Sequence, residues 1–162
     1  MVHAIPNLRF QAQADPNWCW AAVTWMVLDF YTQRQCGVQC QIASQITGGN
    51  CCPSPPADPN DPCFNLINLN DALMGVGHSA GPMLPQPQEF PLVVDQLSAQ
   101  RPICAQVALQ DVNHYVVLSA CTDEGAVRVL DPLGWYDTDF TTLTQFNPSS
   151  PRGFCTGWFL TR

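Results

Sequence analysis

The stretch QADPNWCWAA, residues 13–22, places a cysteine between two tryptophans, directly after a turn-forming Asp-Pro-Asn. Asp15 and Asn17 are of the residue types that accept hydrogen bonds from the first backbone N–H groups of a helix, so either fits the N-cap position. Cys19 is therefore predicted in or next to the first turn. There the positive end of the helix macrodipole stabilises a thiolate, the nucleophilic form of cysteine. An ordinary core or disulfide-bonded cysteine is the alternative interpretation.

The helix predicted over residues 16–32 is apolar on nearly all sides. Between Trp18 and Phe30, only Thr24 and Asp29 carry clearly polar side chains. A helix of this kind belongs in the interior of a protein rather than on its surface. We therefore expect it to be the central helix of the core.

Farther along the chain, helical segments come first and strand segments follow. The strand segments are rich in β-branched and aromatic residues and are bounded by turn residues. This order predicts an α+β fold with an antiparallel sheet, and the absence of internal repeats predicts a single domain over residues 1–162. The predicted helices lie within 35–49, 66–77 and 90–100, and the predicted strands are 103–109, 114–121, 126–130 and 154–160.

Charge and hydropathy narrow the classes of partner. The 162 residues carry a formal net charge of -7, with six basic side chains that are all arginine. This balance disfavours binding to nucleic acid, and no apolar stretch approaches the roughly 18 residues of a membrane span. The lack of lysine would protect the chain from ubiquitination in a eukaryotic host cell, but a GC-biased genome explains it as well.

The nine cysteines suit an oxidising compartment. Residues 1–10 contain no basic region followed by an apolar run, so no signal peptide is expected there. We expect a protein secreted or exported from a bacterium. Either a signal peptide has been removed, or the export pathway recognises another signal.

Eight cysteines remain if Cys19 is catalytic, enough for up to four disulfides. The Pro-rich stretch 50–63 has too little apolar content to order itself, so the preferred bridges lie there. Cys104 and Cys121 could instead be buried thiols. The preferred bridges join Cys36 or Cys40 with Cys51, Cys52 or Cys63. The same five cysteines could form a metal-binding module, but they lack a convincing pair of Cys-x2-Cys knuckles.

A nucleophilic cysteine needs a base, and the sequence offers three histidines. His3 lies near the start of the sequence and His78 lies in a Gly-flanked loop, so both are expected to be solvated or structural. His114 opens a predicted strand and can be held rigidly, as a general base must be. Asp131, at the end of the next strand, is a candidate to orient it.

Strand geometry gives a test of this pairing. If strands 114–121 and 126–130 form a hairpin in which Cys121 pairs with Ala126, paired residue numbers sum to 247. Val116 then lies opposite Asp131, and side chains alternate along a strand, so Asp131 shares a face with His114. A loop one residue longer, without a compensating bulge at Gly125, would turn Asp131 away.

Three motifs in order resemble the papain-like cysteine peptidases: Q-x5-C-W-A from Gln13 to Ala21, NH-Y-V-V around His114, and LDPLG around Asp131. The likeness is strongest to the compact bacterial branch that includes protease effectors injected into plant cells, and it covers residues from about 5 to 136. It implies a papain-like fold, in which a central N-terminal helix carries the nucleophile and packs against a C-terminal antiparallel sheet.

The resemblance also implies roles for individual residues. Gln13 corresponds to the glutamine that donates its amide to the oxyanion, with Gln11 as the fallback. The larger plant and lysosomal enzymes carry Gly-Ser-Cys before Cys-Trp and usually Asn as third member, whereas this chain has Asn17-Trp18 and Asp131. This departure leaves the substrate open.

The resulting hypothesis is a cysteine endopeptidase that hydrolyses peptide bonds with Cys19, His114 and Asp131, and with Gln13 at the oxyanion. A role as a secreted effector or toxin domain fits it. A cell-wall peptide amidase or an acyltransferase on the same scaffold is the alternative. We expect no metal or organic cofactor, a protein or peptide substrate, and a monomer, while a host or cognate protein partner stays open.

Overall fold

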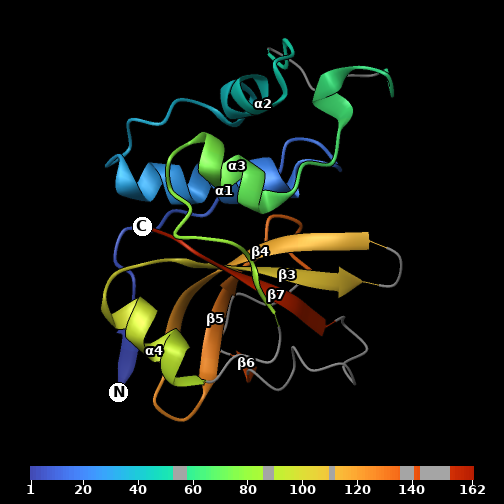
Figure 1. Ribbon diagram of the computed structural model, residues 1–162. Coiled ribbons are helices and arrows are strands. Elements are labelled where there is room, and N and C mark those ends of the chain that lie inside the picture. Colours follow the sequence, from blue (N-terminus) through green and yellow to red (C-terminus); the bar gives the residue numbers. More distant parts are fainter. Residues whose placement is uncertain (53–57, 86–89, 110–111, 136–140, 143–153) are drawn as a thin grey trace.

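The structure is a computed structural model that describes residues 1–52, 58–85, 90–109, 112–135, 141–142 and 154–162. Figure 1 shows α1, α2 and α3 together on one side of a sheet, with α4 near the N-terminus. Residues 53–57 of the predicted Pro-rich loop lie outside the described residues. The helices are α1 (Cys19–Tyr31), α2 (Gln39–Thr47), α3 (Leu69–Gly75), α4 (Phe90–Ser98) and the 3-10 helix η1 (Pro62–Phe64).

The described strands form one antiparallel sheet in the order β2-β7-β3-β4-β5-β6, and β1 pairs with β4. The predicted α+β fold is therefore confirmed. Three strands of two or three residues are not predicted from the sequence, because they are too short to show an alternating pattern. The strands are β1 (Val2–Ala4), β2 (Leu84–Pro85), β3 (Ile103–Leu109), β4 (Val112–Thr122), β5 (Ala126–Leu130), β6 (Thr141–Thr142) and β7 (Phe154–Leu160).

Helix α1 is the buried central helix that the sequence predicts. All of its residues from Cys19 to Val27 are buried. The predicted N-cap is wrong, because neither Asp15 nor Asn17 occupies the N-cap position. Trp18 occupies it, and its side chain makes no capping hydrogen bond. Asp15 instead closes the preceding turn, where its carboxylate accepts from the backbone N–H of Asn17 at 2.8 Å.

The sheet is covered on both faces. Tyr115 and Val117 of β4 pack in the core that contains α1, whereas Val116 and Leu118 pack in the core that contains α4. The alternation of side chains along β4 thus supplies two apolar layers from one strand. No helix in the described part of the chain is long and apolar enough to cross a membrane.

Two disulfides join α2, η1 and the loop between them. Cys40 bonds to Cys52, and Cys51 bonds to Cys63. Both lie in the predicted region, and the first is among the preferred pairs. Cys36, Cys104 and Cys121 are not part of these disulfides, and the last two are buried thiols.

The β4–β5 hairpin has the predicted register near Asp131, but its pairing near the turn differs from the prediction. Val117 pairs with Leu130, as predicted, but Cys121 pairs with Val127 instead of Ala126, so the predicted hairpin closure is wrong. The register shifts by one residue between Leu118 and Ala120, which places a β-bulge at Ser119. The bulge compensates for the longer turn, and the predicted bulge position at Gly125 is not used.

Candidate active site

His114 and Asp131 meet in the interior of the protein. His114 Nε2 lies 2.5 Å from Asp131 Oδ1, and the two side chains are 2% and 0% exposed. His114 comes from β4, whereas Asp131 directly follows β5. A buried carboxylate at this distance fixes the orientation of the imidazole and stabilises its protonated form.

Cys19 is the first residue of α1, and it is one of the groups that raise the pKa of His114. Burial lowers the pKa of His114, but the hydrogen bonds with Asp131 and Cys19 outweigh it and raise this pKa to about 9. Because Nε2 faces Asp131, Nδ1 is the ring nitrogen left for Cys19. The arrangement can therefore hold a proton between a thiol and an imidazole in a site from which water is largely excluded.

Asp131 also organises the turn that follows it. Its Oδ1 accepts from the backbone N–H of Leu133 at 2.9 Å, and its Oδ2 accepts from the N–H of Trp135 at 2.7 Å. The exposed Trp135 ring lies 5.2 Å from the His114 ring, centroid to centroid. Trp135 is not among the site residues predicted from the sequence, although it stands four positions after the candidate Asp131.

Gln13 precedes Cys19 in the same segment, but its amide is already engaged. Its Nε2 donates to the carbonyl oxygens of Asp15 and Pro16, both at 2.8 Å. The backbone N–H of Cys19 has no acceptor among the described residues. Gln11, the fallback, donates only to the adjacent carbonyl of Ala12 at 3.1 Å.

Gln39 of α2 is a second residue near the site that is not predicted from the sequence. Its side chain is buried and bonds to the backbone of Ala12 and Ala14, on either side of Gln13. The sequence gives no signal that a glutamine at the start of a polar helix will bond to the backbone of a segment 25 residues earlier.

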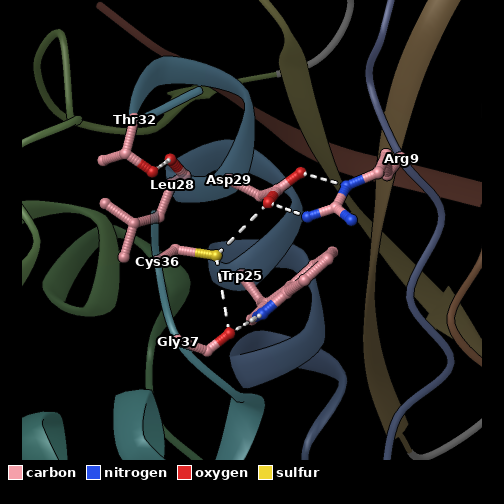
Figure 2. Close-up of polar contacts among 7 residues, drawn as sticks. All are labelled: Arg9, Trp25, Leu28, Asp29, Thr32, Cys36 and Gly37. Carbon is pink, nitrogen blue, oxygen red and sulfur yellow. Dashed lines mark hydrogen bonds and ion pairs between the residues drawn. The ribbon is translucent and has the colours of Figure 1, made fainter. Parts of the chain in front are cut away.

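The segment before Cys19 is also joined to α1 by Arg9, as Figure 2 shows. Arg9 donates to both carboxylate oxygens of the buried Asp29, and its guanidinium lies 5.1 Å from the centre of the Trp25 ring. Arg9 holds the pKa of Asp29 below its usual range. Cys36 donates to the same carboxylate at 3.5 Å, and burial together with Asp29 raises the pKa of this thiol to about 11.

The other two histidines serve structural contacts. His3 bonds to Asp123 and Ser98, each at 2.8 Å, and so joins β1 to two neighbouring elements. His78 stacks on Tyr31, with ring centroids 4.6 Å apart. Neither is brought to Cys19.

The cysteines proposed for a metal-binding module are used differently. Four of the five form the two disulfides, which leaves their sulfur atoms without the thiolate form that binds a metal. No cluster of three or more ligating side chains occurs within the described ranges.

Comparisons with known proteins identify the family and the fold. The family described as Peptidase_C39 like family matches residues 5–149. A crystal structure assigned to a C39-like peptidase from Bacillus anthracis superimposes with a TM-score of 0.55 at 14% sequence identity, and covers 100% of this chain and 98% of that one. No curated protein matches the sequence. The chain therefore belongs to the Peptidase C39-like family, and it is a cysteine peptidase with a papain-like α+β fold.

Proposed function

We propose that the protein hydrolyses peptide bonds with Cys19 as nucleophile, His114 as acid and base, and Asp131 as the residue that orients the imidazole. One observation carries the proposal: a buried imidazole is bonded to a buried carboxylate. A cysteine at a helix N-terminus acts on the pKa of the same imidazole, which supports its role as the partner of His114. Nucleophile, base and orienting group in this sequence define covalent catalysis by acyl transfer.

In the first half-reaction, Cys19 Sγ attacks the substrate carbonyl carbon while its proton resides on His114. The carbonyl oxygen becomes an oxyanion, which the backbone N–H of Cys19 stabilises. The C–N bond then breaks, and His114 gives its proton to the leaving amine. Because the pKa of His114 is about 9, the imidazolium acid is present at neutral pH.

In the second half-reaction, His114 takes a proton from water, and the hydroxide adds to the thioester carbon. Breakage of the C–S bond releases the carboxylate product and restores Cys19. Gln13 is the second oxyanion donor in this proposal. Its amide would exchange the carbonyl of Pro16 for the substrate oxygen, because both of its N–H groups are engaged in the free protein.

The setting of the reaction is part of the same proposal. Two disulfides support work in an oxidising compartment, as for a protein secreted or exported from a bacterium. A role as an effector or toxin domain on a protein substrate is compatible with that setting.

The test is a screen of intact proteins with mass spectrometry of the products. Wild-type protein is compared with Cys19→Ala and with Cys36→Ser, the latter as a thiol variant outside the site. The proposal expects cleavage products from wild type and Cys36→Ser alone. Release from peptidoglycan would favour an amidase, adducts with an added amine would favour a transferase, and cleavage by Cys19→Ala would refute the assignment.

A further inference from the structure

Residues 12–19 contain both the candidate oxyanion donor and the nucleophile. One side chain, that of Gln39, holds the start of this segment through hydrogen bonds to its backbone. Gln39 Nε2 donates to the carbonyl of Ala12 at 3.1 Å, and its Oε1 accepts from the N–H of Ala14 at 2.8 Å. The Gln39 side chain is 5% exposed. A single buried amide therefore fixes the backbone on both sides of Gln13.

The downstream end of the segment is held by two main-chain carbonyls. The fully buried Trp18 donates its indole N–H to the carbonyl of Cys63 at 2.7 Å. Asn17 donates its amide to the carbonyl of Phe64 at 3.1 Å. These two residues immediately precede Cys19, so the position of η1 determines where the turn before the nucleophile lies.

The two anchors are covalently connected by the disulfides. Gln39 directly precedes the half-cystine Cys40, whereas Cys63 of η1 is itself a half-cystine. The other half-cystines of the two bonds, Cys52 and Cys51, are adjacent to each other in the chain. We call the connected residues the disulfide bracket. In order of connection the disulfide bracket is Gln39, Cys40, Cys52, Cys51, Cys63 and Phe64.

We propose that the disulfide bracket positions residues 12–19 for catalysis, so that turnover requires both bracket disulfides oxidised and Cys19 reduced. The inference rests on the proposed function only in taking Cys19 as the nucleophile. When both disulfides are formed, the two anchors keep their positions relative to each other, and Gln13 and Cys19 therefore keep theirs. With the bracket open, the anchors are joined only through the longer path along the chain, whose conformational freedom is greater.

The opening step is a thiol–disulfide exchange. A dithiol such as dithiothreitol gives two electrons and two protons to each cystine, which becomes two thiols, and the dithiol closes to its own cyclic disulfide. A peroxide acts at the other limit: its O–O bond breaks as one oxygen is transferred to the thiolate of Cys19, which becomes a sulfenic acid, and the other oxygen leaves as hydroxide. Activity should therefore pass through a maximum as the solution potential changes.

The first test is a redox titration of the intact wild-type protein in buffers of reduced and oxidised dithiothreitol. Peptide turnover is measured at each potential, and the state of every cysteine is read by mass spectrometry after alkylation. We expect turnover to fall at least tenfold as the bracket cystines open, and to return on reoxidation. Full turnover with both disulfides reduced would overturn the proposal.

A second test uses Gln39→Glu, with Gln45→Glu as its control on the same helix. Glutamate can still accept from Ala14 but cannot donate to Ala12, whereas Gln45 is exposed and bonds only to Gly75. We expect kcat of Gln39→Glu to fall ten- to hundredfold with KM changed less than about twofold, as for a misplaced catalytic group. Equal kcat in the two variants would overturn the proposal.

A readout independent of turnover separates this inference from the proposed function. The rate of Cys19 alkylation by iodoacetamide should be lower in Gln39→Glu than in Gln45→Glu, with both folded by circular dichroism. If no peptide is cleaved by wild type, the proposed function fails, and the alkylation rates alone test whether the disulfide bracket positions Cys19. Equal rates then refute it. If Gln39→Glu does not fold, the redox titration decides, with alkylation of Cys19 as its readout.

Discussion

His114 Nε2 lies 2.5 Å from Asp131 Oδ1 because a one-residue bulge at Ser119 restores the register that the turn of the β4–β5 hairpin would otherwise lose. Paired residue numbers sum to 248 at Cys121 and Val127, but to 247 at the end nearer the site. Without the bulge, residues near Asp131 would present the opposite face to His114. The bulge is thus a condition for the contact between imidazole and carboxylate.

Selective alkylation tests the nucleophile. At about pH 6, iodoacetamide should label Cys19 well ahead of Cys36, whose thiol has a pKa raised to about 11 by burial and by Asp29. Burial also raises the pKa of Cys104, so this thiol should stay unlabelled in the folded protein. Peptide mapping after a brief pulse measures the order. Similar labelling of Cys19 and Cys36 would contradict the assignment.

Substitution of Asp131 tests the orienting group. Asp131→Ala should lower kcat by about 10² to 10⁴, whereas Asp131→Asn should retain part of the activity through its remaining carbonyl oxygen. Both changes remove the negative charge that helps to raise the pKa of His114, so the alkaline limb of kcat should move from about pH 9 to lower pH. Rate profiles from pH 5 to 10 check this. Full activity of Asp131→Ala would leave a Cys19–His114 dyad.

The sign of the stability effect follows from the same pKa. Folding raises the pKa of His114 above its ordinary value near 6.5. Protonation of His114 therefore stabilises the folded state fully below about pH 6.5, and this contribution is lost as the pH rises through about 9. Urea titrations of wild type and His114→Gln should show a pH dependence over this window in wild type only. The same slope in both proteins would argue against a raised pKa.

Paired substitutions of two glutamines test the oxyanion donor. Gln13→Ala should lower kcat by about 10² to 10³ if its amide joins the oxyanion, as removal of one such donor does elsewhere. Gln11→Ala is the matched control, because Gln11 bonds only to the neighbouring carbonyl. Steady-state kinetics on one peptide compare them. A loss confined to Gln11→Ala would move the role to the fallback residue.

Gly125 in the hairpin turn tests stability apart from catalysis. Its φ is +90°, and an added Cβ would meet no atom within 4 Å, so Gly125→Ala costs backbone strain rather than a clash. We expect a loss of about 1–2 kcal/mol in the free energy of unfolding. Because the bulge at Ser119 sets the register near Asp131, kcat should stay unchanged. Glu124→Ala, an exposed neighbour, should leave the melting temperature unaltered.

The fold was predictable from local patterns that tertiary contacts reinforce. The apolar surface all round α1 required burial, and the four longer strands carry β-branched and aromatic residues over five or more positions. The N-cap was not predictable, because Asp15 fits both a cap and the turn before it, and the competing turn took its side chain.

The candidate site was predictable in its residue types but not in its surroundings. Cys19, His114 and Asp131 could be proposed from motif order and strand alternation. The engagement of the Gln13 amide by two carbonyls, and the reach of Gln39 across the arm, depend on packing between segments that no local pattern encodes. The bulge at Ser119 has no sequence signature either, since a serine in a strand is ordinary.

The adjacency of Cys51 and Cys52 has a consequence for how the protein reaches its native state. Two neighbouring thiols that must choose between Cys40 and Cys63 can be exchanged with little movement of the chain, which gives a crossed isomer with the same number of bonds. Four cysteines allow three pairings, and only thiol exchange converts one into another, over seconds to hours. Production of active enzyme should therefore depend on an isomerase or a shuffling buffer rather than on oxidation alone.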